Sequence, residues 1–126
     1  FVGHLKSAAL DFIRRRARSA VVLEAQRHMD RNLAVIRDAR EAATAVGRNP
    51  IYLNRLFRKE VGLTCFAYLQ KVRMERARAL LADPVLSVKE VAHQAGFRNH
   101  IYFSLACRRY WGKSPTALRR QDAAFS

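Results

Sequence analysis

The stretch NPIYLNRLFRKEVG, from Asn49 to Gly62, is typical of a short capped helix with two different faces. The Asn49 side chain can accept hydrogen bonds from the first turn, Pro50 suits the first helical position, and Gly62 can end the helix. At about 100° per residue, one face is apolar and the other is polar and basic. The inward set is Leu53, Leu56 and Phe57, and the outward set is Ile51, Asn54, Arg55 and Arg58. The outward chemistry suits base edges and phosphates, although an ordinary solvated helix face would look the same.

The same pattern returns as NHIYFSLACRRYWG, from Asn99 to Gly112. The matching residues are Asn49, Ile51, Tyr52, Arg58 and Gly62 with Asn99, Ile101, Tyr102, Arg108 and Gly112. The preceding helices also match, through Asp38, Glu41, Ala43 and Gly47 with Ser87, Glu90, Ala92 and Gly96. Each copy is therefore predicted to be a capped helix, a glycine turn and a second capped helix. This helix–turn–helix arrangement is one that reads DNA.

The charge of the chain indicates a polyanionic partner. Lys and Arg number 24 against 10 Asp and Glu, which gives a net charge of +14 and a pI near 11.2. Such an excess suits DNA, RNA or an acidic membrane surface. Half of the residues are hydrophobic, so a folded module is expected rather than a basic tail. No apolar run approaches the roughly 20 residues of a membrane span, so no membrane partner is expected.

No feature of the sequence favours an enzyme, a metal site or a cofactor. There is no Ser/His/Asp order, no glycine-rich phosphate loop and no carboxylate pair outside capping positions. His28 and His93 lack ligand partners at metal spacing, and neither is given a role. Cys65 and Cys107 are too few and too far apart for a disulfide framework, and they fit a reducing compartment such as the cytoplasm.

The expected fold class is all-α, with two helix–turn–helix subdomains joined by a long linker helix: about seven helices plus an N-terminal helical extension. The expected domains are 1–18, a linker or the stub of a missing upstream domain; 19–63, the first subdomain; 64–82, the linker helix; and 83–126, the second subdomain. The basic run at 14–18 either complements a helix C-terminus or touches phosphate, and both readings stand. The chain does not begin with Met, so a fragment or processed product is expected.

The linker helix should measure about 27 Å at 1.5 Å per residue, against about 34 Å for one turn of DNA. It could therefore place two reading helices in successive major grooves. Its predicted buried stripe is Phe66, Leu69, Val72, Ala77, Leu80 and Leu81, and its predicted solvated residues are Lys71, Arg73, Arg76 and Arg78. After the second reading helix, a short helix is expected over 116–120, followed by a frayed tail over 121–126.

Three groups of residues resemble a known family when they are taken together. They are Gly47 with 52–62, the linker run 73–81, and 91–97 with 102–104 and 108–115. Over about residues 20 to 120 the chain resembles the DNA-binding domain of AraC/XylS-type bacterial transcription regulators. The resemblance implies a seven-helix module that binds double-stranded promoter DNA at the nucleoid. It also implies activation of transcription with RNA polymerase as a partner, and an upstream domain that senses an effector or dimerises.

The resemblance also implies positions for the DNA contacts. The base-reading residues would be Ile51, Asn54, Arg55, His100, Ile101, Ser104 and Leu105. The expected phosphate contacts are Arg48, Asn49, Arg58, Lys59, Arg98, Asn99, Arg108, Arg109 and Lys113. Two residues depart from the family pattern, because Leu105 stands where arginine is common and Cys107 where an aromatic residue is common. Leu105 either contacts a thymine methyl group or tilts into the protein.

These departures predict a division of labour between the two units. The first unit offers Asn54 for adenine and Arg55 for guanine, so it is expected to carry most base discrimination. The second should depend more on phosphates and DNA shape. Two alternatives to a sequence-specific regulator are a non-specific basic nucleic-acid-binding protein and a protein-docking module. In the docking module Ile51, Ile101 and Leu105 would form an apolar strip.

Overall fold

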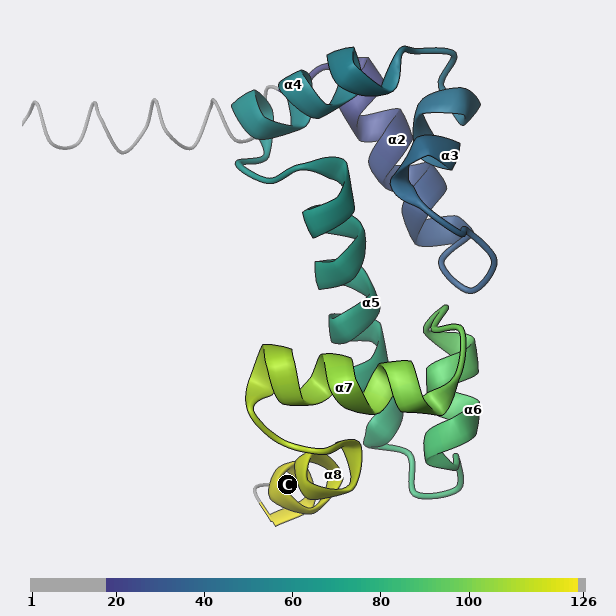
Figure 1. Ribbon diagram of the computed structural model, residues 1–126, viewed down its shortest axis with the longest axis vertical. Helices are drawn as coiled ribbons and strands as arrows, with labels where there is room; N and C mark the ends of the chain where they lie inside the picture. The colour runs from purple at the N-terminus through teal and green to yellow at the C-terminus, as the bar shows by residue number, and fades with distance from the viewer. Residues whose placement is uncertain (1–17, 125–126) are drawn as a thin grey trace, which may run out of the picture. The chain divides into compact units, whose positions relative to one another are not determined.

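The computed structural model describes residues 18–124, and the helices of this range confirm the expected all-α class (Figure 1). The seven described helices are α2 (Ala20–Arg31), α3 (Ala39–Ala45), α4 (Pro50–Glu60), α5 (Cys65–Leu81), α6 (Val88–Gln94), α7 (His100–Trp111) and α8 (Pro115–Ala124). The expected extension over 1–18 lies outside the described residues, apart from Arg18.

Polar side chains cap the starts of several helices. The Asp38 carboxylate accepts a hydrogen bond from the backbone N–H of Glu41 at 3.3 Å, and the Ser87 hydroxyl accepts one from the N–H of Glu90 at 3.1 Å. The Thr64 hydroxyl plays the same part ahead of α5. Each cap satisfies an N–H group that the helix itself leaves unpaired, so these short local patterns fix where the helices start.

The chain divides into two compact units, and the first contains α2, α3, α4 and the first turn of α5. Its core is built from an apolar stripe of α2 and the inner face of α4, where Val22, Met29, Leu53 and Phe57 are fully buried. The Phe57 ring also packs edge-on against Tyr68, with 5.6 Å between the centroids. This packing turns the opposite face of α4 outward.

The second unit contains residues 32–37, α5 from Leu69 onward, α6, α7 and α8. Its buried core is Met74, Ala77, Leu81, Val91, Ala92, Ala95, Phe103, Cys107 and Leu118. Phe97 is partly buried against this core and packs on Phe103 at 5.0 Å between ring centroids. Cys107 therefore fills a core position, and α7 presents its other face to solvent.

Residues 32–37, here called the connector, are held tightly within the second unit. Leu33 and Ile36 are 2% and 3% exposed, whereas Ala34, Val35 and Arg37 are exposed. The guanidinium group of Arg73 donates to the Ile36 carbonyl oxygen, and a Cβ atom added at Gly96 would lie 2.0 Å from the Leu33 carbonyl oxygen. The connector is thus fixed against α5 and the turn before α7.

Two predictions for α5 are wrong. Arg73 was expected in solvent but is 8% exposed, because it supplies the buried Ile36 carbonyl with a hydrogen-bond donor. Phe66 was expected in the core but is 64% exposed, because the inward positions near the start of α5 are taken by Cys65 and Leu69. Both errors arose because the prediction assumed a single buried face along the whole of α5. The start of this helix belongs to the first unit and the rest belongs to the second, so its buried residues do not lie on one stripe.

The frayed tail predicted from residue 121 is also wrong as far as Ala124, where α8 ends. The Arg78 guanidinium donates two hydrogen bonds to the Asp122 carboxylate, at 3.0 and 2.8 Å, and Arg78 also lies 5.2 Å from the Trp111 ring centroid. Arg119 donates to three backbone carbonyl groups around the end of α5. These long-range contacts hold α8 in place beyond residue 120.

Candidate nucleic-acid interface

The outer face of α4 presents the side chains predicted to read bases in the first unit. The Asn49 side-chain oxygen accepts from the N–H of Ile51 at 2.8 Å, which fixes the first turn of the helix. Ile51 is 71% exposed, and Asn54 and Arg55 are exposed as well. An apolar group, an amide and a guanidinium group therefore share one solvent-facing surface, a combination that can contact base edges in a major groove.

Asn54 also makes a hydrogen bond within the protein that was not predicted from the sequence. Its Oδ1 atom accepts a hydrogen bond at 2.9 Å from the backbone N–H of Cys65, the first residue of α5. Paired recognition of adenine needs both the oxygen and the NH2 group of an asparagine. Because the oxygen already holds the start of α5, Asn54 can pair with adenine only by sharing or giving up that bond.

The outer face of α7 has the same frame but a more apolar surface. The Asn99 side-chain oxygen accepts from the N–H of Ile101 at 3.0 Å, and Phe103 is fully buried on the inner side. Ile101 and Leu105, one turn apart, are 60% and 48% exposed. Leu105 thus stays on the exposed face, and it does not tilt into the core. The two polar reading candidates of this helix, His100 and Ser104, are half-buried.

The repeat explains why Ser104 makes no hydrogen bond like the one from Cys65 to Asn54. Ser104 occupies the position of Asn54 in the second copy, and Pro115 occupies the position of Cys65. Proline has no backbone N–H, so the hydrogen bond that joins α4 to the start of α5 has no counterpart between α7 and α8. The start of α8 is instead capped by Ser114, whose hydroxyl accepts from the N–H of Ala117 at 3.1 Å.

The predicted phosphate contacts are all exposed: Arg48, Asn49, Arg58, Lys59, Arg98, Asn99, Arg108, Arg109 and Lys113. Four of them are the basic residues of the last turns of α4 and α7, where cations also complement the helix dipole. Asn49 and Asn99 use their side-chain oxygens as caps, which leaves their NH2 groups as the side-chain donors for phosphate. The Lys113 ammonium group also donates to the Gln121 side chain.

Tyr52 and Tyr102 lie beside the reading residues, and they were matched in the repeat without being predicted to contact DNA. They are 47% and 52% exposed, and each directly follows an exposed isoleucine. A phenol hydroxyl can donate to a phosphate oxygen. The sequence did contain a signal for a role of these two residues, because tyrosine recurs at matching positions of the two copies. A tyrosine needed only to pack one core would not be expected at an exposed position in both.

The two thiols of the chain are both buried. Cys65 and Cys107 are buried, and burial raises the pKa of each thiol to about 11, which is the opposite of activation. Within residues 18–124 no group of three His, Cys, Asp or Glu side chains is placed to hold a metal ion. No helix in the same range is long and apolar enough to cross a membrane.

Comparison with known proteins decides the family. A helix–turn–helix domain model matches residues 42–121, which is more than half of the chain. The chain belongs to the AraC/XylS-type family of helix–turn–helix transcription regulators. It is a DNA-binding domain of that family, which is a family of regulators and not of enzymes.

Relatives in this AraC/XylS-type family match different lengths of the chain. The uncharacterized regulator YijO of Escherichia coli is 34% identical over 121 residues, which is 95% of this chain and 43% of that protein. The Msm operon regulatory protein of Streptococcus mutans is 40% identical over 70 residues, which is 56% of this chain and 25% of that protein. The chain thus spans less than half the length of these relatives.

Solved structures share the fold of this AraC/XylS-type domain. The C-terminal domain of AraT, a response regulator from Geobacillus stearothermophilus, has a TM-score of 0.77 and 29% identity, over 83% of this chain and 88% of that one. The DNA-binding domain of AdpA, solved in complex with a target DNA, also has a TM-score of 0.77, with 28% identity over 84% of this chain and 96% of that one.

Proposed function

We propose that this domain binds double-stranded DNA sequence-specifically, with α4 and α7 each entering a major groove, and thereby regulates transcription. The observation that carries the proposal is the repeat of one surface on two helices. Each helix has an asparagine cap, a buried inner face, an exposed isoleucine and a basic last turn. The AdpA domain, which has the same fold and was solved with a target DNA, supports this choice of partner.

In the first unit, Arg55 is the principal base reader. Its guanidinium group can donate two parallel hydrogen bonds to a guanine, and each good paired contact is worth about 1–3 kcal/mol of discrimination. Ile51 packs on the groove floor beside it. Asn54 contributes less than its amide alone would allow, because its oxygen is engaged by Cys65.

In the second unit, Ile101 and Leu105 form an apolar strip that suits thymine methyl groups. His100 and Ser104 are the polar readers, and each offers a single point of contact rather than a paired one. The exposed cations of this unit, including Arg98 and Arg108, anchor the backbone. We therefore infer that base discrimination rests mainly on α4 and that α7 depends more on phosphates and DNA shape.

The linker helix α5 has 17 residues, about 26 Å at 1.5 Å per residue. This length supports an asymmetric site of two segments about one DNA turn apart, read in successive major grooves. The longer relatives support further domains in the whole protein. In that protein an upstream domain would sense an effector or dimerise, RNA polymerase would be the partner in activation, and the cytoplasmic nucleoid would be the place of action.

The test is selection of duplexes from a random DNA pool, followed by affinity measurements against salt. We expect a two-part motif with its halves about 10 base pairs apart, and log K should fall by roughly 0.9 per neutralised phosphate. Arg55→Ala should weaken the selected site by about 1–3 kcal/mol and relax it at one position. Leu105→Ala is the matched change in α7, and it should relax the motif less.

The other outcomes each identify a different function. Tight, salt-sensitive binding without an enriched motif would identify a non-specific nucleic-acid binder. Weak binding that barely depends on salt would identify a protein-docking module that uses the exposed Ile51, Ile101 and Leu105. If Leu105→Ala changed the motif more than Arg55→Ala, the division of labour between the two helices would be wrong.

A further inference from the structure

The outer face of α7 presents aliphatic carbon where the outer face of α4 presents a guanidinium group. Ile101 and Leu105, about one helical turn apart, are 60% and 48% exposed and are here called the α7 strip. We propose that the α7 strip reads the C5-methyl groups of pyrimidines rather than the bases that carry them, so that 5-methylcytosine can replace thymine in the half-site of α7. The inference rests on the proposed function and extends it to methylated DNA.

The α7 strip is held outward by the packing of the opposite side of the helix. Phe103 and Cys107 are fully buried in the core of the second unit. The Asn99 cap fixes the first turn, because its side-chain oxygen accepts from the N–H of Ile101 at 3.0 Å. Since the inward positions of α7 are already filled, the strip is presented to a partner without any rearrangement of the helix.

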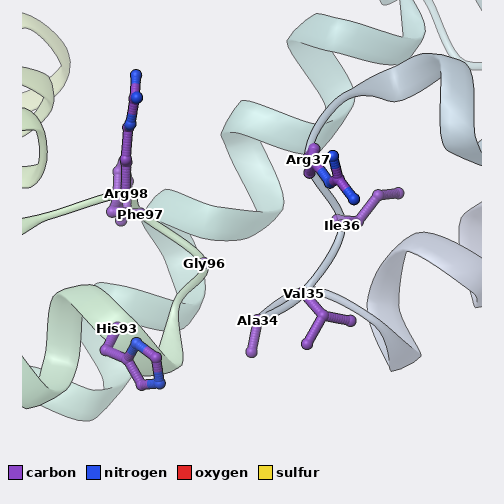
Figure 2. A pocket seen from close by; sticks show the side chains of 8 residues that line it. All are labelled: Ala34, Val35, Ile36, Arg37, His93, Gly96, Phe97 and Arg98. Atoms are coloured by element: carbon purple, nitrogen blue, oxygen red, sulfur yellow. The ribbon is translucent and has the colours of Figure 1, made fainter.

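The charge around the α7 strip favours DNA over a protein as its partner. α7 contains no acidic residue, and its last turn carries Arg108 and Arg109, both exposed. Arg98, close to the start of α7, is exposed too, and Figure 2 shows its side chain extending away from His93 and Ala34. Cations therefore lie near both ends of the strip. This arrangement matches a methyl-lined major groove bordered by phosphates.

The chemistry of the α7 strip makes it a reader of methyl groups. Neither of its side chains can form a hydrogen bond, so only the carbon surface of a base edge is detected. In the major groove thymine shows a C5-methyl group beside the O4 acceptor, whereas cytosine shows an N4 donor and no methyl group. 5-Methylcytosine combines the N4 donor with the methyl group of thymine. An aliphatic side chain therefore makes the same contact with thymine and with 5-methylcytosine.

The polar neighbours of the α7 strip do not separate these two bases. A Ser104 hydroxyl can donate or accept, and a neutral His100 imidazole has one donor and one acceptor nitrogen. Each can therefore adapt to the O4 acceptor or to the N4 donor. In the first copy of the repeat, Arg55 occupies the position of Leu105, and a guanidinium group only donates. Methyl reading is thus expected of α7, and hydrogen-bond reading of α4.

The experiment starts from the duplex that the wild-type chain selects, in which the half-site of α7 is the half that Arg55→Ala leaves unrelaxed. Each thymine of this half-site is replaced in turn by uracil, by 5-methylcytosine or by cytosine, the last two paired with guanine. Uracil removes only the methyl group, and 5-methylcytosine keeps it but exchanges the hydrogen-bonding groups. At a thymine that the strip contacts, uracil and cytosine should each raise Kd about fourfold, whereas 5-methylcytosine should stay within about twofold of thymine.

Variants assign the effect to the α7 strip. Ile101→Ala and Leu105→Ala should each remove most of the uracil penalty at one thymine, because the shortened side chain no longer reaches the methyl group. Ile51→Ala is the matched change in α4, and it should leave every penalty in the half-site of α7 unchanged. Alanine suits an exposed helix position, and urea unfolding checks that each variant folds. In the half-site of α4, exchanging the guanine read by Arg55 for adenine should cost at least about fivefold.

The other outcomes separate the inference from the proposed function. If 5-methylcytosine weakened binding as much as cytosine, α7 would read the hydrogen-bonding groups of thymine, and the inference would be overturned. A half-site without thymine would overturn it too. Uracil penalties unchanged in Ile101→Ala and Leu105→Ala would overturn it and leave the strip to a protein partner. In these three cases the two-part motif and the proposed function stand, whereas the absence of any enriched motif would overturn both.

Discussion

Replacing Gly96 by alanine should destabilise the domain far more than replacing Gly47, although the two glycines occupy matching turns of the repeat. Both have positive φ, +91° at Gly96 and +66° at Gly47. A Cβ atom at Gly47 would meet nothing within 4 Å, whereas one at Gly96 would lie 2.0 Å from the Leu33 carbonyl oxygen. The pair therefore separates the cost of backbone strain from the cost of a clash with the connector.

The magnitudes follow from these two terms. A left-handed alanine costs about 1–2 kcal/mol, and this is the whole expected loss for Gly47→Ala. Gly96→Ala has to move backbone by about 1 Å or more, which also breaks the buried bond from Arg73 to the Ile36 carbonyl, worth about 1.5–3 kcal/mol. The expected total for Gly96→Ala is about 3–5 kcal/mol. Such a loss approaches the whole stability of a small domain.

The assay is urea unfolding followed by circular dichroism, with both variants and the wild type at the same pH. Asparagine tolerates positive φ better than alanine, so Gly47→Asn should be closer to the wild type than Gly47→Ala, whereas Gly96→Asn should stay strongly destabilised. Equal losses for Gly47→Ala and Gly96→Ala would refute the reasoning, because they would mean that the connector does not press against the turn before α7.

Three further predictions concern single side chains. Arg119→Lys should lower the free energy of unfolding by about 1.5–3 kcal/mol, because an ammonium group cannot span the three carbonyl groups that the guanidinium group reaches; an unchanged urea midpoint would contradict this. Asn54→Ala should lower the free energy of unfolding by about 1 kcal/mol, because it removes the hydrogen bond to the backbone N–H of Cys65. Asn54→Asp should keep the stability and lose DNA affinity. Equal urea midpoints for Asn54→Ala and the wild type would argue against that hydrogen bond. The hydrogen bonds from Arg78 hold the pKa of Asp122 below its usual value. The free energy of unfolding that the wild type has in excess of Asp122→Asn should therefore be constant above about pH 5 and disappear as pH falls through the folded pKa. An excess that increased as the pH was lowered would contradict this prediction.

Much of the fold and of the reading surface could be predicted from the sequence because the signals are local. Caps such as Asn49 and Asn99 act on N–H groups two or three residues away, and helical periodicity places side chains three or four residues apart on the same face. The exposure of Ile51 and Ile101 and the burial of Phe57 followed from this periodicity alone. The repeat then supplied a second, independent copy of the same pattern.

Contacts between distant segments could not be predicted in this way. The burial of Arg73, the helical course of the chain beyond residue 120, the bond between Asn54 and Cys65, and the cleft between the connector and the turn before α7 each depend on groups far apart in the sequence. Helical periodicity and capping residues do not specify such contacts, because the contacts depend on how distant segments pack in the tertiary structure.

The sequence by itself determined the helices from α2 to α7 and the start of α8, the two outward-facing reading surfaces and the basic charge that suits DNA. Only the tertiary structure decided which of those side chains remain fully available to a base. From the sequence, Asn54 is expected to be free to pair with adenine, but its side-chain oxygen accepts a hydrogen bond from the backbone N–H of Cys65 at the start of α5. Ser104 makes no matching hydrogen bond, because Pro115 at the matching position has no N–H. The physical reason is that a hydrogen-bonding atom serves whichever donor the fold brings within about 3 Å of it.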